Sequence, residues 1–507
     1  MMPPDHDSGQ PEHAPQEPPR AALGGASPPP RYATPERAPP LPPRAAKPAS
    51  GRAPGNVSQL RHRLDPKEPF AAACRFRLRY AVEGVPGLHH WRGDFLAWAG
   101  THYDVTSEAT YRAEFYRGLQ DQGDKPNRRH IGDLIDALRS ACFLPESIEA
   151  PGWLPGYDGA DPAELVAVSN GLLNTRTRTL APPEPRLFAT SALPVAYYVN
   201  APEPIEWLGF LGSIWPDDPQ TIEALQEWFG LVALTEVTRY QKALLICGPK
   251  RSGKGTILRV LRELAGPANT VAPTLGELGE RFGLQPLIGK RLAIVSDARL
   301  SGRADVAAIA EAILRISGED AVTVQRKHRE DWTGKLPTRF VIASNELPTL
   351  ADASAALSSR FIVLSMRRSF FGEEDPGLTD RLLEELPGIL LWSLQGLDRL
   401  RVRGRLLQPE TGRELASALE SLSSPISSFI ADECVVEAWA SIERLALFNA
   451  WREWCNAHGV KEAGTEANFG KKLRAALPNL GSKRGASGGS RVRMHTGIRL
   501  RSLADPD

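Results

Sequence analysis

The chain has 507 residues, of which 42% are hydrophobic and 24% charged, and its 61 basic residues almost balance its 60 acidic ones. Such a length accommodates about three or four domains, and the balanced charge leaves room only for a local nucleic-acid-binding surface. Without a long apolar run or a hydrophobic N-terminal signal, the chain is expected to be cytoplasmic and to have no membrane partner. The five cysteines are too scattered to predict a structural zinc site.

Residues 1–65 are predicted to be a disordered tail. The first 60 residues hold 16 of the 44 prolines and almost no large apolar side chain. Such a segment cannot bury enough surface to offset its chain entropy. A plain tail and a tether for a partner both fit this composition.

Residues 66–225 are predicted to form a mixed α/β domain. Its aromatic residues surround amphipathic stretches, and we interpret them as core rather than as a base-stacking surface. An apolar period near 3.6 predicts helices, and short apolar runs predict strands. The helices are expected over residues 131–143, 205–215 and 221–234, and the strands over residues 165–175 and 194–200.

The most informative segment is LLICGPKRSGKGTILRVL, residues 244–261. Gly248, four further residues, Gly253 and Lys254 give the spacing of a Walker A phosphate loop between an apolar strand and a helix. Backbone N–H groups of such a loop surround phosphates, the helix N-terminus is positive, and the lysine reaches the β- and γ-phosphates. Gly255 stands where a magnesium-binding hydroxyl is expected. The predicted nucleotide-binding residues are Gly248, Pro249, Lys250, Arg251, Ser252, Gly253, Lys254, Gly255 and Thr256.

Residues 226–405 alternate short apolar strands with helices, which predicts a mainly parallel sheet covered on both faces. A helical stretch at 376–401 contains Pro387, which should break or kink it. The strands are expected at 243–248, 291–297, 339–345 and 361–366, and the other helices at 255–266 and 305–317.

Polar residues next to these strands predict the rest of an ATPase site. Asp297 ends one strand and suits Mg²⁺, which it would hold directly or through water. Asn345 ends another, and its amide could orient the attacking water. Arg360 precedes the last strand. It could stabilise transferring phosphate charge in a neighbouring subunit's site, or could equally be a surface salt-bridge residue.

The ordered motifs GPKRSGKGT, KRLAIVSDA, GEDAVTVQRKHRED, FVIASNELP and SSRF resemble those of superfamily 3 helicases. The closest likeness is to phage and plasmid primase–helicases related to those of poxviruses, and it extends upstream to VSNGLLNTRTRTL and LQEWFGLVAL. The resemblance implies an AAA+-like P-loop core that uses ATP and Mg²⁺ within a ring, a hexamer. Asn345 would be the sensor and Arg360 the finger supplied in trans. Lys327 and His328, on a hairpin within residues 323–331, would touch single-stranded DNA.

The chain departs from this family at three points. Gly255 replaces the usual hydroxyl residue, so Thr256 or water would complete the Mg²⁺ shell beside Asp297. Asp297 itself stands where the phage branch often has glutamate. Residues 1–225 carry neither a paired-carboxylate motif nor a zinc module of a primase, so the sequence gives no support for primase activity.

Residues 406–425 are predicted to be a linker, and residues 426–507 a winged-helix DNA-binding domain. Helices are expected at 447–459 and 465–477, the second with Thr465 as its N-cap, before a Gly/Ser-rich turn between basic strands. Residues 465–501 contain nine Lys or Arg and one acid. This charge is typical of a nucleic-acid-binding surface, although a solvated basic tail is the alternative. The predicted DNA contacts are Lys471, Lys472, Arg474, Arg491 and Arg493.

These features favour an ATP-dependent DNA helicase or translocase of a phage, prophage or plasmid. It would act as a ring on single-stranded and forked DNA in the cytoplasm of a bacterial host. The single acid at 297 and the missing hydroxyl at 255 leave a second function open, that of a replication initiator that binds ATP as an assembly switch without unwinding. A small-molecule kinase is a third, weaker alternative.

Overall fold

The computed structural model describes most of the chain beyond residue 63. Residues 1–63 of the predicted proline-rich tail and His328 lie outside the described residues, whereas Leu64, at the end of that prediction, is buried in the N-terminal core. The described residues are 64–235, 239–298, 305–327, 329–348, 355–423, 425–458, 463–487 and 490–502.

The N-terminal part begins with three helices around a small antiparallel sheet of order β1-β2-β3. Ser107 and Asn127 cap the second and third helices by accepting hydrogen bonds from backbone N–H groups. One core of aromatic and aliphatic side chains, including Phe76 and Phe115, joins these elements. The elements are α1 (Pro69–Arg77), η1 (Leu78–Tyr80), β1 (Leu88–Trp91), β2 (Asp94–Trp98), β3 (Tyr103–Thr106), α2 (Glu108–Asp121) and α3 (Arg128–Ala141).

Short strands follow. Two of them, β5 and β6, form the hairpin that the strand prediction for 165–175 covers. The strand predicted at 194–200 is wrong, because β9 ends at Leu193 and Pro194 has no N–H to donate to a neighbouring strand. The elements are β4 (Gly152–Trp153), η2 (Pro162–Glu164), β5 (Leu165–Val168), β6 (Gly171–Asn174), β7 (Leu180–Ala181), β8 (Leu187–Phe188) and β9 (Ala192–Leu193).

A five-stranded sheet of order β11-β12-β15-β10-β16 is the centre of the next part, and all its neighbouring strands are parallel. This confirms the predicted α/β class with a parallel sheet. The strands are β10 (Ala243–Cys247), β11 (Thr270–Val271), β12 (Leu292–Val295), β15 (Arg339–Ser344) and β16 (Phe361–Ser365). The neighbouring elements are α4 (Ile205–Ile214), α5 (Pro219–Leu234), α6 (Lys254–Ala265), η3 (Pro267–Asn269), α7 (Leu275–Leu278), η4 (Gln285–Leu287), α8 (Val306–Ser317) and α9 (Ala355–Ser358).

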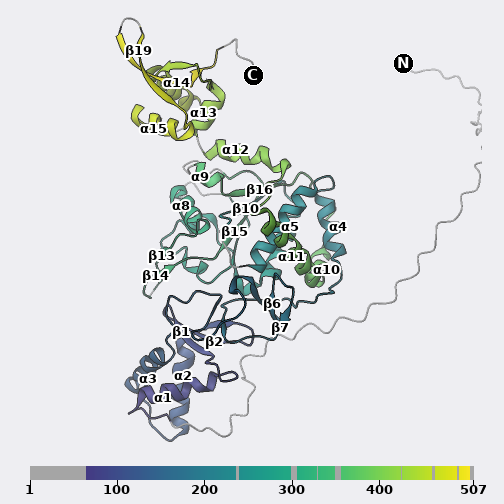
Figure 1. Cartoon of the computed structure of the whole chain (residues 1–507), viewed down its shortest axis with the longest axis vertical. Coiled ribbons are helices and arrows are strands. Elements are labelled where there is room, and N and C mark those ends of the chain that lie inside the picture. The colour runs from purple at the N-terminus through teal and green to yellow at the C-terminus, as the bar shows by residue number, and fades with distance from the viewer. Residues whose placement is uncertain are drawn as a thin grey trace, which may run out of the picture. The chain divides into compact units, whose positions relative to one another are not determined.

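Both faces of this sheet are covered by helices (Figure 1). Successive side chains of β10 enter two different cores, because neighbouring residues of a strand point to opposite faces. Leu244 and Ile246 pack with α4, α5 and α6, whereas Ala243 and Leu245 pack with α7 and α8. The apolar strands are therefore buried on both sides, as a parallel sheet requires.

The predicted helical stretch at 376–401 is two helices, α10 (Leu378–Glu384) and α11 (Leu386–Arg403). Pro387 lies in the first turn of α11, where a missing N–H costs nothing. The chain therefore breaks next to this proline, as predicted.

The stretch 406–425, which the sequence predicts to be a linker, contains regular structure. It contains η5 (Glu410–Gly412) and α12 (Arg413–Ser423), and α13 (Pro425–Glu433) begins at its end. Leu419 of α12 is fully buried in the core on the α8 side of the sheet. One apolar face of this helix thus anchors it to the core.

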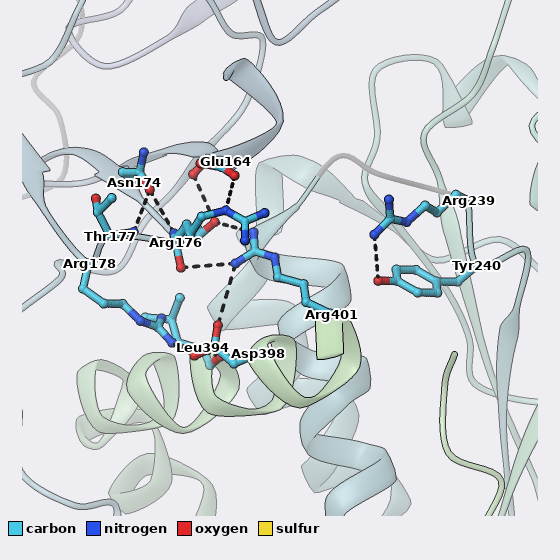
Figure 2. A network of polar contacts seen from close by, with 11 residues as sticks. Glu164, Asn174, Arg176, Thr177, Arg178, Arg239, Tyr240, Leu394, Asp398 and Arg401 are labelled. Atoms are coloured by element: carbon cyan, nitrogen blue, oxygen red, sulfur yellow. Dashed lines mark hydrogen bonds and ion pairs between the residues drawn. The ribbon is translucent and has the colours of Figure 1, made fainter. Parts of the chain in front are cut away.

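Polar networks attach α11 to its surroundings. Figure 2 shows Arg178 and Arg401 joining the turn after β6 to α11. Arg178 is paired with Asp398, and the Arg401 guanidinium donates to the Thr175 hydroxyl at 2.7 Å. On α5, the buried Glu227 carboxylate accepts two hydrogen bonds from Arg403, at 2.6 and 3.0 Å.

The C-terminal part has its own core, built around Trp451 and Phe469. The predicted N-cap is present, since the Thr465 hydroxyl accepts from the Asn468 N–H. Strands β18, β20 and β19 form an antiparallel sheet, and β17 pairs with β21. The elements are β17 (Cys434–Val435), β18 (Ser441–Glu443), α14 (Arg444–Ala457), α15 (Glu466–Ala476), β19 (Gly481–Ser487), β20 (Ser490–Thr496) and β21 (Arg499–Leu500). Among the described residues, no helix is long and apolar enough to cross a membrane.

Candidate nucleotide site and nucleic-acid interface

The predicted phosphate loop connects β10 to α6, and α6 begins at Lys254. Two of its glycines are required by the local geometry. A Cβ at Gly248 would lie 2.5 Å from the Met366 carbonyl oxygen, and Gly253 has a φ of +95°. Arg251 also adopts a left-handed conformation, with a φ of 60°. The loop therefore turns tightly at the N-terminus of α6, where backbone N–H groups can meet an anion.

The Lys254 ammonium lies against its own loop. It donates to the carbonyl oxygens of Gly248 and Pro249 at 2.7 Å each, and contacts the Ser252 hydroxyl at 3.3 Å. Partial burial lowers the pKa of Lys254 from its usual value, while neighbouring Cys247 acts in the opposite direction. A phosphate would offer this cation charged oxygens in place of neutral carbonyls.

The sheet brings two of the other predicted catalytic residues, Asp297 and Asn345, to the edge that carries this loop. Asp297 follows β12 after one intervening residue, and Asn345 follows β15 directly. Strand β15 pairs in parallel with both β12 and β10, so the carboxyl ends of all three strands share one edge. Asp297 and Asn345 are both exposed there. A ligand held by the phosphate loop would therefore meet an amide and a carboxylate on its β15–β12 side.

Oxygen donors suited to Mg²⁺ are present at this edge. Thr256, in the first turn of α6, is partly exposed, and Asp297 supplies a carboxylate. No cluster of three or more His, Cys, Asp or Glu side chains that could bind a metal exists within the described ranges. Mg²⁺ usually keeps several waters and binds through one or two protein oxygens and the substrate phosphates, so Thr256 and Asp297 are residues that could hold it.

Arg360 lies at the other end of the strands, where the amino ends of β10 and β16 meet. Its carbonyl oxygen accepts from the Ala243 N–H at the start of β10, whereas the phosphate loop follows the end of that strand. A five-residue strand is about 16 Å long. The Arg360 guanidinium instead donates to the side chain of Gln241. The structure therefore does not bring Arg360 to the phosphate loop of its own chain.

The segment after β16 contacts the phosphate loop directly, and the sequence analysis missed it. Residues 366–377, here named the β16–α10 loop, bind the loop main chain through Met366, Ser369 and Phe370. The predicting signal would have been the run SFFGEED, which places two aromatic residues beside a turn glycine.

The predicted hairpin exists as β13 (Val322–Val324) paired antiparallel with β14 (Trp332–Gly334). Lys327 lies in its turn and is exposed, and its backbone N–H donates to the Gln285 side chain at 3.1 Å. Two further cations, Arg326 and Arg329, flank it. The Arg326 side chain is only 8% exposed, whereas that of Arg329 is 57% exposed.

Asp94 at the start of β2 pairs with both of these arginines. Its carboxylate oxygens lie 3.3 Å from Arg326 and 2.6 Å from Arg329. Arg92 of the same turn stacks over Trp91, with its guanidinium 4.4 Å from the ring centre. The sequence could not predict the pairing of Asp94 with Arg326 and Arg329, because more than 230 residues separate Asp94 from these arginines.

The basic residues predicted to bind DNA in the C-terminal part fall on two elements. Lys471, Lys472 and Arg474 lie on α15 and are exposed. Arg493 is exposed on β20, and Arg491 lies two positions before it in the same strand. Arg484, which the prediction omits, is directly opposite Arg493 in the β19–β20 register.

A five-stranded parallel sheet with a glycine-rich loop between a strand and a helix is consistent with a P-loop-like core. Two solved structures of the NrS-1 C-terminal region resemble the chain. One, of residues 305–718 of that protein, has a TM-score of 0.49 at 12% identity and covers 85% of this chain and 100% of its own. The other, an A-form apo structure, has a TM-score of 0.46 at 11% identity and covers 81% and 97%.

Three segments of the chain match known protein families. Residues 154–216 match the D5 N-terminal-like family, and residues 423–490 match the poxvirus D5 protein-like family. These two matches confirm the resemblance to the phage and poxvirus primase–helicases. Residues 246–360, which run from the end of β10 to Arg360, match a family of unknown function, DUF5906.

Proposed function

We propose that this protein is an ATP-dependent DNA helicase or translocase that acts as a ring, a hexamer, in the replication of a phage, prophage or plasmid. The observation that supports it best is the sheet edge that collects the phosphate loop, Asp297 and Asn345. The D5-type matches add a context of replication-associated helicases and primases.

In this proposal the phosphate loop and the N-terminus of α6 bind the phosphates of ATP. Lys254 leaves the carbonyl oxygens of Gly248 and Pro249 and contacts the β- and γ-phosphates, where its charge is better satisfied. Asp297 and Thr256 hold Mg²⁺, which neutralises phosphate charge as it develops. Asn345 orients the water that attacks the γ-phosphate.

Arg360 completes the site of a neighbouring subunit. Its position beside the start of β10, away from the phosphate loop of its own chain, supports this role. A guanidinium supplied in trans stabilises the charge of the transferring phosphoryl group. Each site then needs two subunits, which links ATP turnover to the ring.

DNA contacts are proposed on two basic surfaces. On the β13–β14 hairpin, the exposed Lys327 binds a backbone phosphate, and His328 is a further predicted contact, whereas Arg329 is paired with Asp94. On the C-terminal hairpin, Arg484 and Arg493 are directly opposite, an arrangement in which like charges repel. A phosphate beside them removes this repulsion, which favours a nucleic acid over a solvated tail. The α15 cations would extend this winged-helix surface.

A mixing experiment tests the proposal. Lys254→Ala should abolish ATP turnover stimulated by single-stranded DNA, because the phosphate-binding charge is lost. Arg360→Ala should also fail alone. Mixed with Lys254→Ala protein it should regain partial activity, since some interfaces then combine an intact lysine with an intact arginine. Full turnover by Lys254→Ala would overturn the ATPase assignment, and absence of any recovery on mixing would remove the trans role of Arg360.

A second candidate is a replication initiator that uses ATP as an assembly switch without unwinding. Gly255 in place of a hydroxyl residue favours it, because a weak Mg²⁺ site would slow hydrolysis more than binding. Strand displacement on a forked duplex, compared with the ATPase rate of the same sample, separates the two candidates.

A further inference from the structure

The first half of the β16–α10 loop (residues 366–377) is hydrogen-bonded to the end of β10 and to the phosphate loop. The Met366 N–H donates to the Cys247 carbonyl at 2.8 Å, and the Phe370 N–H donates to the Arg251 carbonyl at 2.8 Å. The Ser369 hydroxyl donates to the Lys250 carbonyl at 2.9 Å. These bonds fix the two segments side by side.

The β16–α10 loop lies on the side of the phosphate loop away from the proposed catalytic residues. In the sheet, β10 has β15 on one side and β16 on the other. Asp297 and Asn345 follow β12 and β15, so the γ-phosphate belongs on that side. The rest of a nucleotide then extends towards the end of β16, where residues 366–377 begin.

Phe371 stands on this segment and is 81% exposed. It occupies the second position of a turn in which the Glu373 N–H donates to the Phe370 carbonyl at 2.9 Å and Gly372 has a φ of +83°. A carboxylate oxygen of Glu374 accepts from the Gly372 N–H, and another pairs with Arg251 of the phosphate loop at 3.3 Å. The turn is thus held in place, and it presents the ring to solvent without further ordering.

We infer that the β16–α10 loop forms the base-binding side of the nucleotide site and that the Phe371 ring stacks on the adenine. Single exposed apolar residues are common on protein surfaces. Here the ring is on a preformed turn bonded to the phosphate loop, and a purine offers the flat apolar face that an aromatic ring prefers. The inference rests on the proposed ATP site and adds the residue that recognises the base.

Calorimetric titration with two Mg²⁺-bound ligands tests this role: a non-hydrolysable ATP analogue, and tripolyphosphate, which has no base. Phe371→Ala should bind the analogue roughly 5- to 100-fold more weakly, the range expected for a lost base stack. Its affinity for tripolyphosphate should not change. Phe371→Trp should stay within a few-fold of the wild type for both ligands. Phe143→Ala, which removes another exposed phenylalanine, is the matched control.

Three results would overturn the inference. Equal weakening for both ligands would assign Phe371 to the shape of the phosphate loop. Unchanged binding of both ligands together with loss of subunit association would assign it to a subunit interface. If the wild type bound neither ligand, the proposed ATP site itself would be wrong, and the base site would fall with it. This last result differs from the others because it does not depend on Phe371.

Discussion

Thr256 is the first residue of α6 with a hydroxyl group. Gly255, which has no side chain, occupies the position before it, where the hydroxyl residue of a phosphate loop usually stands. The glycine is not forced by crowding: a Cβ added there would meet only the Arg259 guanidinium, at 3.7 Å. The usual hydroxyl could therefore be accommodated, and its absence leaves Thr256 as the nearest side-chain ligand for Mg²⁺ beside the phosphates.

This arrangement predicts how Mg²⁺ dependence responds to substitution. Thr256→Val keeps the shape of the side chain and removes its hydroxyl, so the Mg²⁺ concentration that half-saturates ATPase activity should rise about tenfold, the loss of one metal-bound oxygen. Adding Gly255→Thr to that variant should lower the half-saturating Mg²⁺ concentration again, because a hydroxyl then stands at the usual position. Titration of ATPase rate against Mg²⁺ measures both. An unchanged requirement in Thr256→Val would show that water completes the shell.

At the residue scale, motif spacing in the sequence located the phosphate loop, Asp297 and Asn345, and the sheet gathers them at one edge. Other residues of the proposed site and of the hairpin could not be predicted from the sequence. Asp94 reaches the hairpin arginines only through tertiary folding, and no local pattern marks it. Phe371 is also invisible to periodicity, because it lies in a loop.

Glu227 on α5 illustrates a buried charge that holds two elements together. Its side chain is fully buried, and it accepts from Arg403 and from the Leu407 N–H at 3.1 Å. Burial raises the pKa of this carboxyl, whereas Arg403 acts in the opposite direction. The carboxylate therefore depends on its partners to remain charged.

Glu227→Gln should lower the free energy of unfolding by about 3 kcal/mol, because it leaves the Arg403 guanidinium without its counter-charge in a partly buried site. Urea denaturation followed by circular dichroism measures the change. Glu223→Gln, an exposed position one turn earlier on α5, should alter stability by less than about 0.5 kcal/mol. Equal effects of the two substitutions would contradict the role given to Glu227.

At the element scale, periodicity predicted α3, α4, α5, α6, α8 and the four main strands of the sheet, because each has a clear apolar pattern. It failed where tertiary contacts decide. The strand expected at 194–200 did not form next to Pro194, and α12 formed in the expected linker because its apolar face, including Leu419, found a core to cover.

The β13–β14 hairpin is predicted to bind DNA more tightly when Asp94 is neutralised. Asp94→Asn removes the counter-charge of Arg329, which is exposed and can then contact a phosphate, whereas Arg326 stays buried. The affinity for single-stranded DNA should rise, and the slope of its logarithm against the logarithm of salt concentration should steepen by about 0.7.

Fluorescence anisotropy over a range of salt concentrations measures this slope. The matched control is Glu149→Gln. Glu149 pairs with Arg92, in the turn between β1 and β2, and its ion pair with Arg92 does not involve Arg326 or Arg329. An Asp94→Asn slope equal to that of the wild type would show that releasing Arg329 from Asp94 adds no DNA contact.

At the scale of the whole molecule, the strand order β11-β12-β15-β10-β16 determines the proposed chemistry. It places β15 between the strands that carry the phosphate loop and Asp297, and the parallel direction of β10 and β16 leaves Arg360 at the amino ends of the strands. The sequence predicted a parallel sheet but not this order, because strand pairing depends on long-range contacts that no local pattern encodes.

Strand displacement from a forked duplex is the most direct test of the central claim. With ATP and Mg²⁺ the wild-type protein should release the displaced strand, and Lys254→Ala should release none while still binding the fork. ATP hydrolysis stimulated by single-stranded DNA with no strand released by the wild type would contradict unwinding and favour the ATP-switched initiator.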